Sequence, residues 1–367
     1  MQERAAMTAE QLGTTVQAEF EKLRDIVSAH FQLEEALIEL GVPTFYLKQP
    51  QETKEPFLRL LRELDPMGLI AFLRKKEGRL VLKIFQKPPV KPSNTLINWV
   101  LFFATIGTTF ATGYFLSASL ANIGGAINPL LGGLMFTVAM MSVLGAHEMG
   151  HKITANKEGI EATPPYFIPG PPPNLGGFGT FGAVIIQKSL PSNKDTLFDV
   201  GASGPIVGFI VATIVTAIGL AMSVPAPPYE GAAELPFPLM MVFIGELLNY
   251  FKMIPRPSQG EVLYLHPVGF AGWVCMLVTM LNLLPAAMLD GGHIARASVG
   301  DKVRTILTAV SIIMLVINKF WLMALFVLFL SLQRHPGPLD DVSKLSRKRK
   351  ILALVLVAIF ILTFPTF

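Results

Sequence analysis

Beyond residue 95, long apolar runs with few or no charged residues alternate with short polar segments. The runs cover residues 96–120, 127–146, 200–224, 237–251, 267–289, 306–332 and 351–364. About 20 apolar residues in a row are enough to cross a bilayer as a helix. We therefore predict an α-helical polytopic membrane protein with about 6–8 transmembrane helices.

Two of these runs are not simple crossings. Run 237–251 is short and contains Glu246, which favours a surface or re-entrant helix. Run 306–332 is interrupted by Asn318 and Lys319, which predicts two short helices and leaves one tilted helix as the alternative.

The distribution of lysine and arginine predicts the orientation in the membrane. Residues 225–236 contain Glu230 and Glu234 but no lysine or arginine, so this loop is expected outside. Basic residues follow the runs that end at 146, 289 and 332. We expect these ends, and the first 95 residues, to face the cytosol.

Residues 1–95 are polar and contain no apolar run that could span a bilayer, so we predict a small cytosolic α+β domain that is a candidate for regulation. The pattern predicts a helix over 9–30, a strand within 36–47, a helix over 55–64 and a hairpin of 69–73 with 80–85 turning at Gly78. Residues 87–92 form a stiff basic linker. Residues 96–367 are then the membrane domain.

No targeting segment is recognisable at the start of the sequence. Residues 1–13 contain Glu3 and Glu10 and lack an apolar core, unlike a signal peptide or a transit sequence. This pattern favours a multi-pass protein of a prokaryotic cell membrane over a plastid protein.

Composition excludes an ordinary soluble protein. Of 367 residues, 51% are hydrophobic and 15% are charged, against about 25% charged in soluble domains. The single cysteine, Cys275, excludes an intrachain disulfide. The net charge is +4, and the basic residues flank apolar runs instead of forming one patch, so we expect the lipid bilayer and no nucleic acid as a partner.

The most informative motif ends the apolar run 127–146. His147, Glu148 and His151 read H-E-x-x-H, and residues four apart share one face of a helix. Two imidazoles can then bind one Zn²⁺, with Glu148 beside the attacking water. Ionisable groups at membrane depth are costly unless they are paired or bind a metal. The alternative is a hydrogen-bonded polar cluster between helices.

A catalytic zinc site needs a third protein ligand, and we predict Asp290. It ends the uncharged run 267–289, with Pro285, Gly291 and Gly292 positioned to loosen the helix around it. An Asp that caps a helix is the alternative. Glu246 is the rival ligand, and His293 is expected to support the site or to pack beside it.

These residues resemble the site-2 protease family of intramembrane zinc metalloproteases. H-E-M-G-H at 147–151 is followed by N-L-L-P at 282–285 and L-D-G-G at 289–292. P-Y-F-I-P at 165–169, G-T-F-G-A-V-I-I at 179–186 and D-V-G-A-S-G-P-I-V-G-F at 199–209 are similar to archaeal, cyanobacterial and plastid members. The resemblance covers about residues 127–292.

The resemblance implies one Zn²⁺ held by His147, His151 and Asp290, with Glu148 as general base. It also implies hydrolysis of peptide bonds in or near the bilayer. Asn282 matches an asparagine of the family that can hydrogen-bond substrate or the developing oxyanion. An interhelical hydrogen bond is the alternative role for Asn282.

The loop 152–199 after the zinc motif is rich in proline and glycine. We predict a re-entrant β-hairpin here, in which 179–187 is an edge strand that pairs with extended substrate. Its candidate substrate-binding residues are Gly179, Phe181, Gly182 and Val184. A plain linker is the alternative.

The sequence thus predicts an intramembrane zinc metalloendopeptidase that acts on single-span membrane proteins, because an extended bond requires a helix that can unwind and enter sideways. A metal-handling transporter and a non-catalytic membrane adaptor are the alternative functions. Glu148 separates them from the protease, because zinc transport needs no general base beside the metal.

Overall fold

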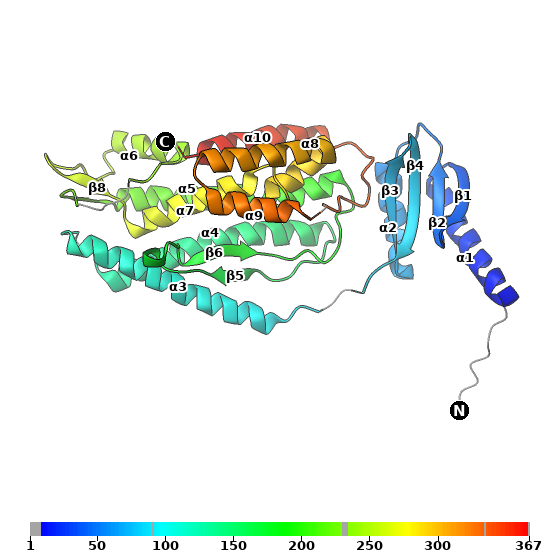
Figure 1. The fold of residues 1–367 in the computed structure, drawn as a ribbon, viewed down its shortest axis with the longest axis horizontal. Coiled ribbons are helices and arrows are strands. Elements are labelled where there is room, and N and C mark those ends of the chain that lie inside the picture. Colours follow the sequence, from blue (N-terminus) through cyan, green and yellow to red (C-terminus); the bar gives the residue numbers. More distant parts are fainter. Residues whose placement is uncertain (1–8, 90–91, 126, 230–233, 334, 366–367) are drawn as a thin grey trace, which may run out of the picture. The chain divides into compact units, whose positions relative to one another are not determined.

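A computed structural model of the chain describes residues 9–89, 92–125, 127–229, 234–333 and 335–365. The chain divides into two compact units, which are described separately below (Figure 1). The smaller unit contains Met1–Lys91, Leu190–Lys194 and Gly337–Lys344. The larger unit contains the remaining residues.

The smaller unit is a four-stranded antiparallel sheet with two helices. Its elements are α1 (Ala9–His30), β1 (Leu33–Glu39), β2 (Val42–Leu47), α2 (Lys54–Leu64), the 3₁₀ turn η1 (Asp65–Met67), β3 (Leu69–Lys76) and β4 (Arg79–Gln86), with strand order β1-β2-β4-β3. Leu47 on β2, Leu73 on β3 and Leu82 on β4 form one core with Val27 of α1 and Leu60 of α2. Both helices therefore pack on the same sheet face.

Turn chemistry explains both hairpins of this sheet. The β3–β4 hairpin turns at Glu77 and Gly78, which both have positive φ (52° and 84°), as a tight turn between antiparallel strands requires. The prediction of this hairpin is confirmed. The prediction of one strand within 36–47 is incomplete, because Leu40 and Gly41 also adopt positive φ and separate β1 from β2.

Two later segments of the chain complete the smaller unit. Leu73 on β3 donates its N–H to Leu339 O (2.9 Å) and accepts from the N–H of Asp341 (3.2 Å). Asp340 in turn donates its N–H to Ser192 O (2.9 Å). Segments 337–344 and 190–194 thus extend the outer edge of β3, which the sequence pattern of residues 1–95 did not indicate.

The larger unit is mainly helical. Its elements are α3 (Thr95–Asn122), α4 (Pro129–Lys157), β5 (Tyr166–Pro169), η2 (Pro173–Leu175), β6 (Thr180–Val184), α5 (Lys194–Ala221), β7 (Val224–Ala226), α6 (Leu239–Tyr250), β8 (Val262–Tyr264), α7 (Pro267–Leu283), α8 (Asp290–Ile317), α9 (Trp321–Ser331) and α10 (Arg347–Thr363). Within the described residues, α3, α4 and α5 are long and apolar enough to cross a membrane. The protein is a helical membrane protein.

Local sequence signals set the helix boundaries of this unit. Asn128 caps α4 by accepting hydrogen bonds from Leu130 N and Leu131 N, and Pro129 occupies the first turn. The predicted continuous run 267–289 is wrong at its end, because α7 stops at Leu283 just before Pro285, which has no N–H to continue the helix. The expected break at Asn318 and Lys319 is confirmed by the end of α8 at Ile317 and the start of α9 at Trp321.

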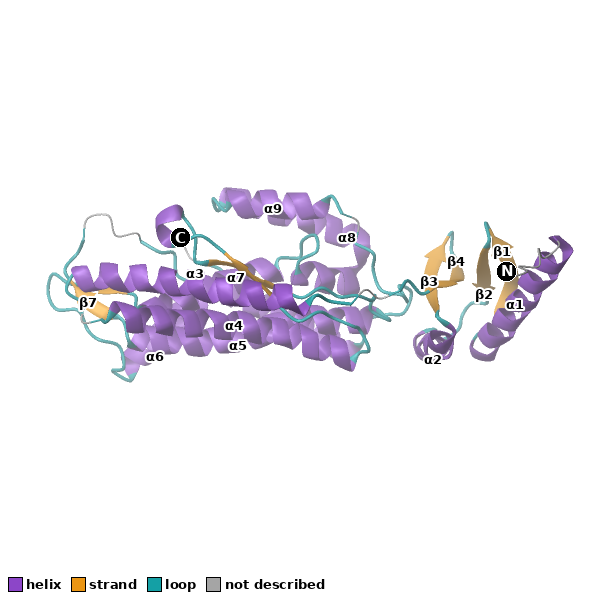
Figure 2. Cartoon of the chain, turned by 90° about the horizontal axis from the view of Figure 1, so that it is seen from below, coloured by secondary structure: helices purple, strands orange, loops and turns teal. Residues whose placement is uncertain are grey.

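A two-stranded hairpin follows α4. β5 pairs antiparallel with β6, and the hairpin lies alongside α3 and α4 (Figures 1 and 2). Residues 180–184 form the strand, where the sequence indicated 179–187. The sheet has two strands, so β6 leaves one edge without a strand partner among the described residues.

Candidate metal centre and catalytic site

Helix α4 presents His147, Glu148 and His151 inside the larger unit. Each of the three residues is buried, with at most 6% of its surface exposed. His147 and His151 lie one helical turn apart, and their ring centroids are 4.9 Å from each other. The H-E-x-x-H spacing therefore puts both imidazoles on one face of α4.

Asp290 reaches this face from the first turn of α8, which follows a tight α7–α8 loop. Gly291 permits that loop because a Cβ there would lie 2.2 Å from Leu283 O, closer than any side chain allows. The loop is also held from α8: Ala287 O accepts from Arg304 (3.1 Å), and Ala287 N–H donates to Thr308 Oγ1 (3.1 Å). The Asp290 carboxylate is thus presented by a fixed turn.

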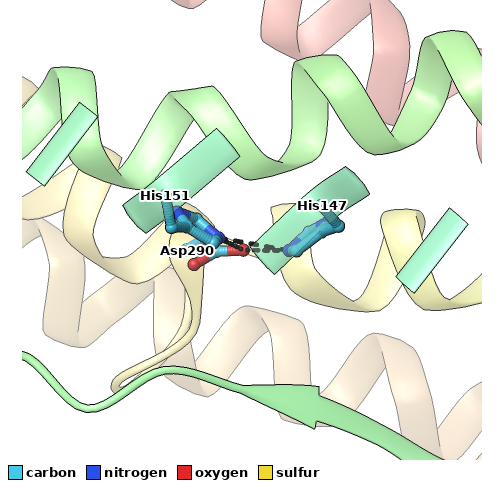
Figure 3. Close-up of side chains that lie close together, drawn as sticks. All are labelled: His147, His151 and Asp290. Atoms are coloured by element: carbon cyan, nitrogen blue, oxygen red, sulfur yellow. Dashed lines mark hydrogen bonds and ion pairs between the residues drawn. The ribbon is translucent and has the colours of Figure 1, made fainter. Parts of the chain in front are cut away.

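Three ligand atoms converge between these elements (Figure 3). Asp290 Oδ2 is 3.2 Å from Nε2 of both His147 and His151, and the two Nε2 atoms are 3.2 Å apart. Ligands on a tetrahedral zinc with bonds of roughly 2.0–2.1 Å lie roughly 3.3 Å from one another. The donor types and their mutual distances therefore fit one zinc ion.

The other ring nitrogen of His151, Nδ1, also has a hydrogen-bond partner. His151 Nδ1–H donates to Val200 O on α5 (2.6 Å), which fixes the tautomer that leaves Nε2 free as a ligand. Gly204, one turn further along α5, lies beneath the imidazole: a Cβ there would be 2.1 Å from Nε2. Helix α5 therefore orients His151 with its own backbone.

Glu148 lies beside the convergence point and next to β6. The backbone of Ile185, one residue after β6, lies close to the Glu148 carboxylate. Val184, the last residue of β6, keeps 46% of its surface exposed. The end of this strand is thus within reach of the carboxylate that the H-E-x-x-H motif predicts as base.

The structure also places the other residues singled out from the sequence. Asn282 Nδ2 is 3.3 Å from His147 Nε2, so its amide lies at the metal-binding face. Glu246 is exposed on α6 and is not part of the convergent group. His293 Nδ1 lies 2.7 Å from His335 Nε2, also outside that group.

The hairpin residues are held at one end and exposed at the other. Gly179 O accepts from Thr108 Oγ1 of α3 (2.6 Å), immediately before β6. Phe181 is 69% exposed, and Gly182 has φ +103° at the irregular pairing opposite Ile168. The sequence did not indicate one supporting group of the site, the carbonyl oxygen of Val200, because backbone atoms carry no residue-type signal.

A model of the family described as Peptidase family M50 matches residues 135–325, just over half of the 367 residues. The chain belongs to Peptidase family M50. The part of the chain that matches this M50 model includes α4 with H-E-x-x-H, the β5–β6 hairpin and the Asp290 turn. The resemblance to the site-2 protease family is thereby confirmed.

The chain is similar to several plant proteins. The chain is 31% identical over 215 residues to "Probable zinc metalloprotease EGY2, chloroplastic" of Arabidopsis thaliana, covering 57% of this chain and 37% of that protein. It is 25% identical over 308 residues to the EGY2 protein of Oryza sativa subsp. indica, covering 80% of this chain and 55% of that protein. It is 27% identical over 243 residues to "Probable zinc metalloprotease EGY1, chloroplastic" of Arabidopsis thaliana, covering 63% of this chain and 42% of that protein. The chain thus spans 37% to 55% of these relatives' lengths. No solved structure matches.

Proposed function

We propose that this protein is an intramembrane zinc metalloendopeptidase that hydrolyses peptide bonds in or near transmembrane segments of membrane proteins. The convergence of His147, His151 and Asp290 beside Glu148 carries the proposal. Membership of the M50 family and the zinc metalloprotease names of the plant relatives support it.

His147, His151 and Asp290 hold the metal in this proposal. A zinc ion bound by these residues would supply Lewis-acid polarisation of the scissile carbonyl and would make a bound water molecule more acidic. Glu148 accepts the proton of the attacking water and passes it to the leaving nitrogen. The Asn282 amide, 3.3 Å from His147 Nε2, is near enough to donate a hydrogen bond to the carbonyl oxygen as negative charge develops there.

The experiment compares zinc content and cleavage of a single-span substrate by the full chain in detergent. We expect Glu148→Gln to retain zinc and to lose cleavage, because the amide cannot accept the proton. Glu246→Gln is the matched control and should retain both, since Glu246 is exposed on α6. Loss of zinc in Glu246→Gln would show that Glu246 is a zinc ligand. Full cleavage by Glu148→Gln would remove Glu148 from the mechanism.

We infer that substrate binds as an extended strand on the free edge of β6. The two-stranded sheet and the proximity of Ile185 to the Glu148 carboxylate support this role. Val184→Pro removes a backbone N–H from the strand and should abolish cleavage while zinc is retained. Val184→Thr keeps the N–H and a β-branched side chain, and should cleave normally. Full activity of Val184→Pro would refute strand pairing.

We propose single-span proteins as substrates, since one helix can unwind and approach the edge strand sideways. A substrate with glycines in its membrane segment should be cut faster than a Leu-rich, Gly-free one, because glycine weakens the helix. Equal rates would argue against unwinding as a requirement.

We further propose that about seven apolar segments cross a prokaryotic cell membrane, with the smaller unit and the active site toward the cytosol. Single cysteines introduced at Lys48 and Glu261 in a Cys275→Ala background test the orientation. A membrane-impermeant thiol reagent should label them from opposite sides, and labelling from the same side would contradict the proposed topology.

The transporter and adaptor alternatives have no support from the family or from the relatives' names. The Glu148→Gln comparison separates them from the protease, because neither alternative requires the carboxylate.

A further inference from the structure

We propose that Arg349 is a positioning residue for the zinc site, acting through the first two turns of α5. This inference rests on the zinc site of the proposed function. Arg349 lies on the first turn of α10, beyond the region that the family model matches. It contacts no zinc ligand directly in any interaction of the described residues, so its effect has to travel through α5.

Arg349 joins two carboxylates on one face of α5. Its Nε donates to Asp199 Oδ1 (2.7 Å), its Nη2 donates to Asp199 Oδ2, and its Nη1 donates to Asp195 Oδ2 (2.8 Å). The backbone N–H of Ser346 donates to the other oxygen of Asp195 (2.9 Å). Asp195 and Asp199 are one turn apart, so a single guanidinium brackets both.

These carboxylates depend on Arg349 because they are shielded from water. Only 13% of the Asp195 side chain and 23% of the Asp199 side chain are exposed. Two like charges one turn apart on a helix repel each other, and partial burial strengthens the repulsion. Loss of the Arg349 guanidinium therefore destabilises the first two turns of α5.

The same turns hold His151 and contact the Asp290 turn. Val200, the residue after Asp199, accepts the hydrogen bond from His151 Nδ1 at 2.6 Å. Gly201 follows, and a Cβ there would lie 3.1 Å from His293 Cβ and 3.3 Å from Asp290 O, so α5 packs closely on the first turn of α8. Movement of α5 changes both the orientation of His151 and its spacing from Asp290.

A contact on α4 fixes the same end of α5 from the other side. Thr196 Oγ1 donates to Glu158 Oε2 (2.8 Å) at the C-terminal end of α4. The start of α5 is therefore anchored to α4 through Thr196 and to α10 through Arg349. Loss of the α10 anchor therefore removes one of the contacts that position Val200 O.

The test is a zinc titration against a competing chromophoric chelator, using the full chain in detergent. Arg349→Met should weaken zinc binding about tenfold, because groups that orient metal ligands contribute about 10- to 100-fold to metal affinity and Arg349 acts one layer further out. Arg349→Met combined with Asp195→Asn and Asp199→Asn removes the repulsion and should restore affinity to within about twofold. Lys83→Met removes an ion pair with Glu39 (2.9 Å) in the smaller unit and should leave affinity unchanged.

Unchanged zinc affinity in folded Arg349→Met, even with a lower Tm, would overturn the positioning role and leave only a structural one. A triple variant as weak as Arg349→Met would overturn the charge argument. If Arg349→Met does not fold, Asp199→Asn carries the test, since it keeps the ion pair to Asp195. The titration measures zinc binding and not cleavage. A protein that binds zinc and cleaves nothing would therefore refute the proposed function, while the titration would still show whether Arg349 positions the zinc site.

Discussion

Replacing Gly204 with alanine should remove most of the protein's zinc affinity, because this glycine lies beneath a ligand ring. An alanine Cβ would be 2.1 Å from His151 Nε2 and 2.4 Å from Cδ2. Non-bonded heavy atoms rest at about 3.5 Å, so ring and methyl have to separate by about 1.4 Å. The ring cannot turn away freely, since its Nδ1 is held by Val200 O at 2.6 Å.

The displacement sets the magnitude of the effect. Metal–ligand distances tolerate only about 0.2 Å, so a shift of about 1.4 Å takes His151 out of the coordination sphere or moves α5 as a whole. Loss of a partner that only orients a ligand weakens metal binding about 10- to 100-fold. We expect Gly204→Ala to weaken zinc binding at least about 100-fold, which corresponds to about 2.7 kcal/mol.

Two other glycines give a graded comparison in the same chelator titration. A Cβ at Gly208 would lie 2.9 Å from His147 Nδ1, so the shift needed is about 0.6 Å, less than half of that at Gly204, and Gly208→Ala should lose less zinc affinity than Gly204→Ala. Gly245 on α6 has open space around it, and Gly245→Ala should bind zinc like the wild type. Wild-type affinity in Gly204→Ala, or equal losses in all three variants, would refute the geometric argument.

Two further predictions concern the hairpin and the smaller unit. Thr108→Val removes the hydroxyl that donates to Gly179 O (2.6 Å) and should lower the local stability of the hairpin by about 0.5–1.5 kcal/mol. The loss should appear as faster amide hydrogen exchange over 178–184. Unchanged exchange there would show that this hydrogen bond does not hold the hairpin. Phe57→Ala empties a fully buried position of α2 in the core of the smaller unit and should lower the free energy of unfolding of that unit by about 3–5 kcal/mol. Denaturant titration of the full chain measures this loss. A loss below about 1 kcal/mol would contradict the packing of α2 on the sheet.

The sequence indicates which ionisable side chains converge, because these residue types stand at fixed spacings or at the end of an apolar run. Helical periodicity alone places His147 and His151 together. Asp290 could be proposed because a carboxylate at the end of an uncharged run is costly without a partner. The structure brings the three side chains together, and their assignment as zinc ligands with Glu148 as base remains a proposal to be tested.

Backbone interactions account for what the sequence did not indicate. Segments 337–344 and 190–194 join the smaller unit through N–H and C=O groups, such as those of Leu73 and Leu339, and any residue type can supply these. The partner of His151 is likewise a carbonyl, that of Val200. The division of 33–47 into two strands was missed because Leu40 adopts the left-handed conformation without being glycine.

Two turn residues mark breaks in the secondary structure through their own conformation. Gly78 marks the β3–β4 hairpin, and Pro285 marks a break after α7 although the apolar run continues to Leu289. The number of membrane crossings is harder to derive, because α6, α7 and α9 are apolar but short and can cross only with their flanking residues or not at all.

The most direct test of the central claim is mass spectrometry of a single-span substrate incubated with the purified, zinc-loaded protein in water enriched in heavy oxygen. Hydrolysis activated by Glu148 predicts two complementary fragments cut within or next to the membrane segment, with one heavy oxygen in the new C-terminal carboxylate. These fragments should be absent with Glu148→Gln. An intact substrate in the presence of stoichiometric zinc, together with zinc uptake into vesicles that contain the protein, would contradict the protease and favour a transporter.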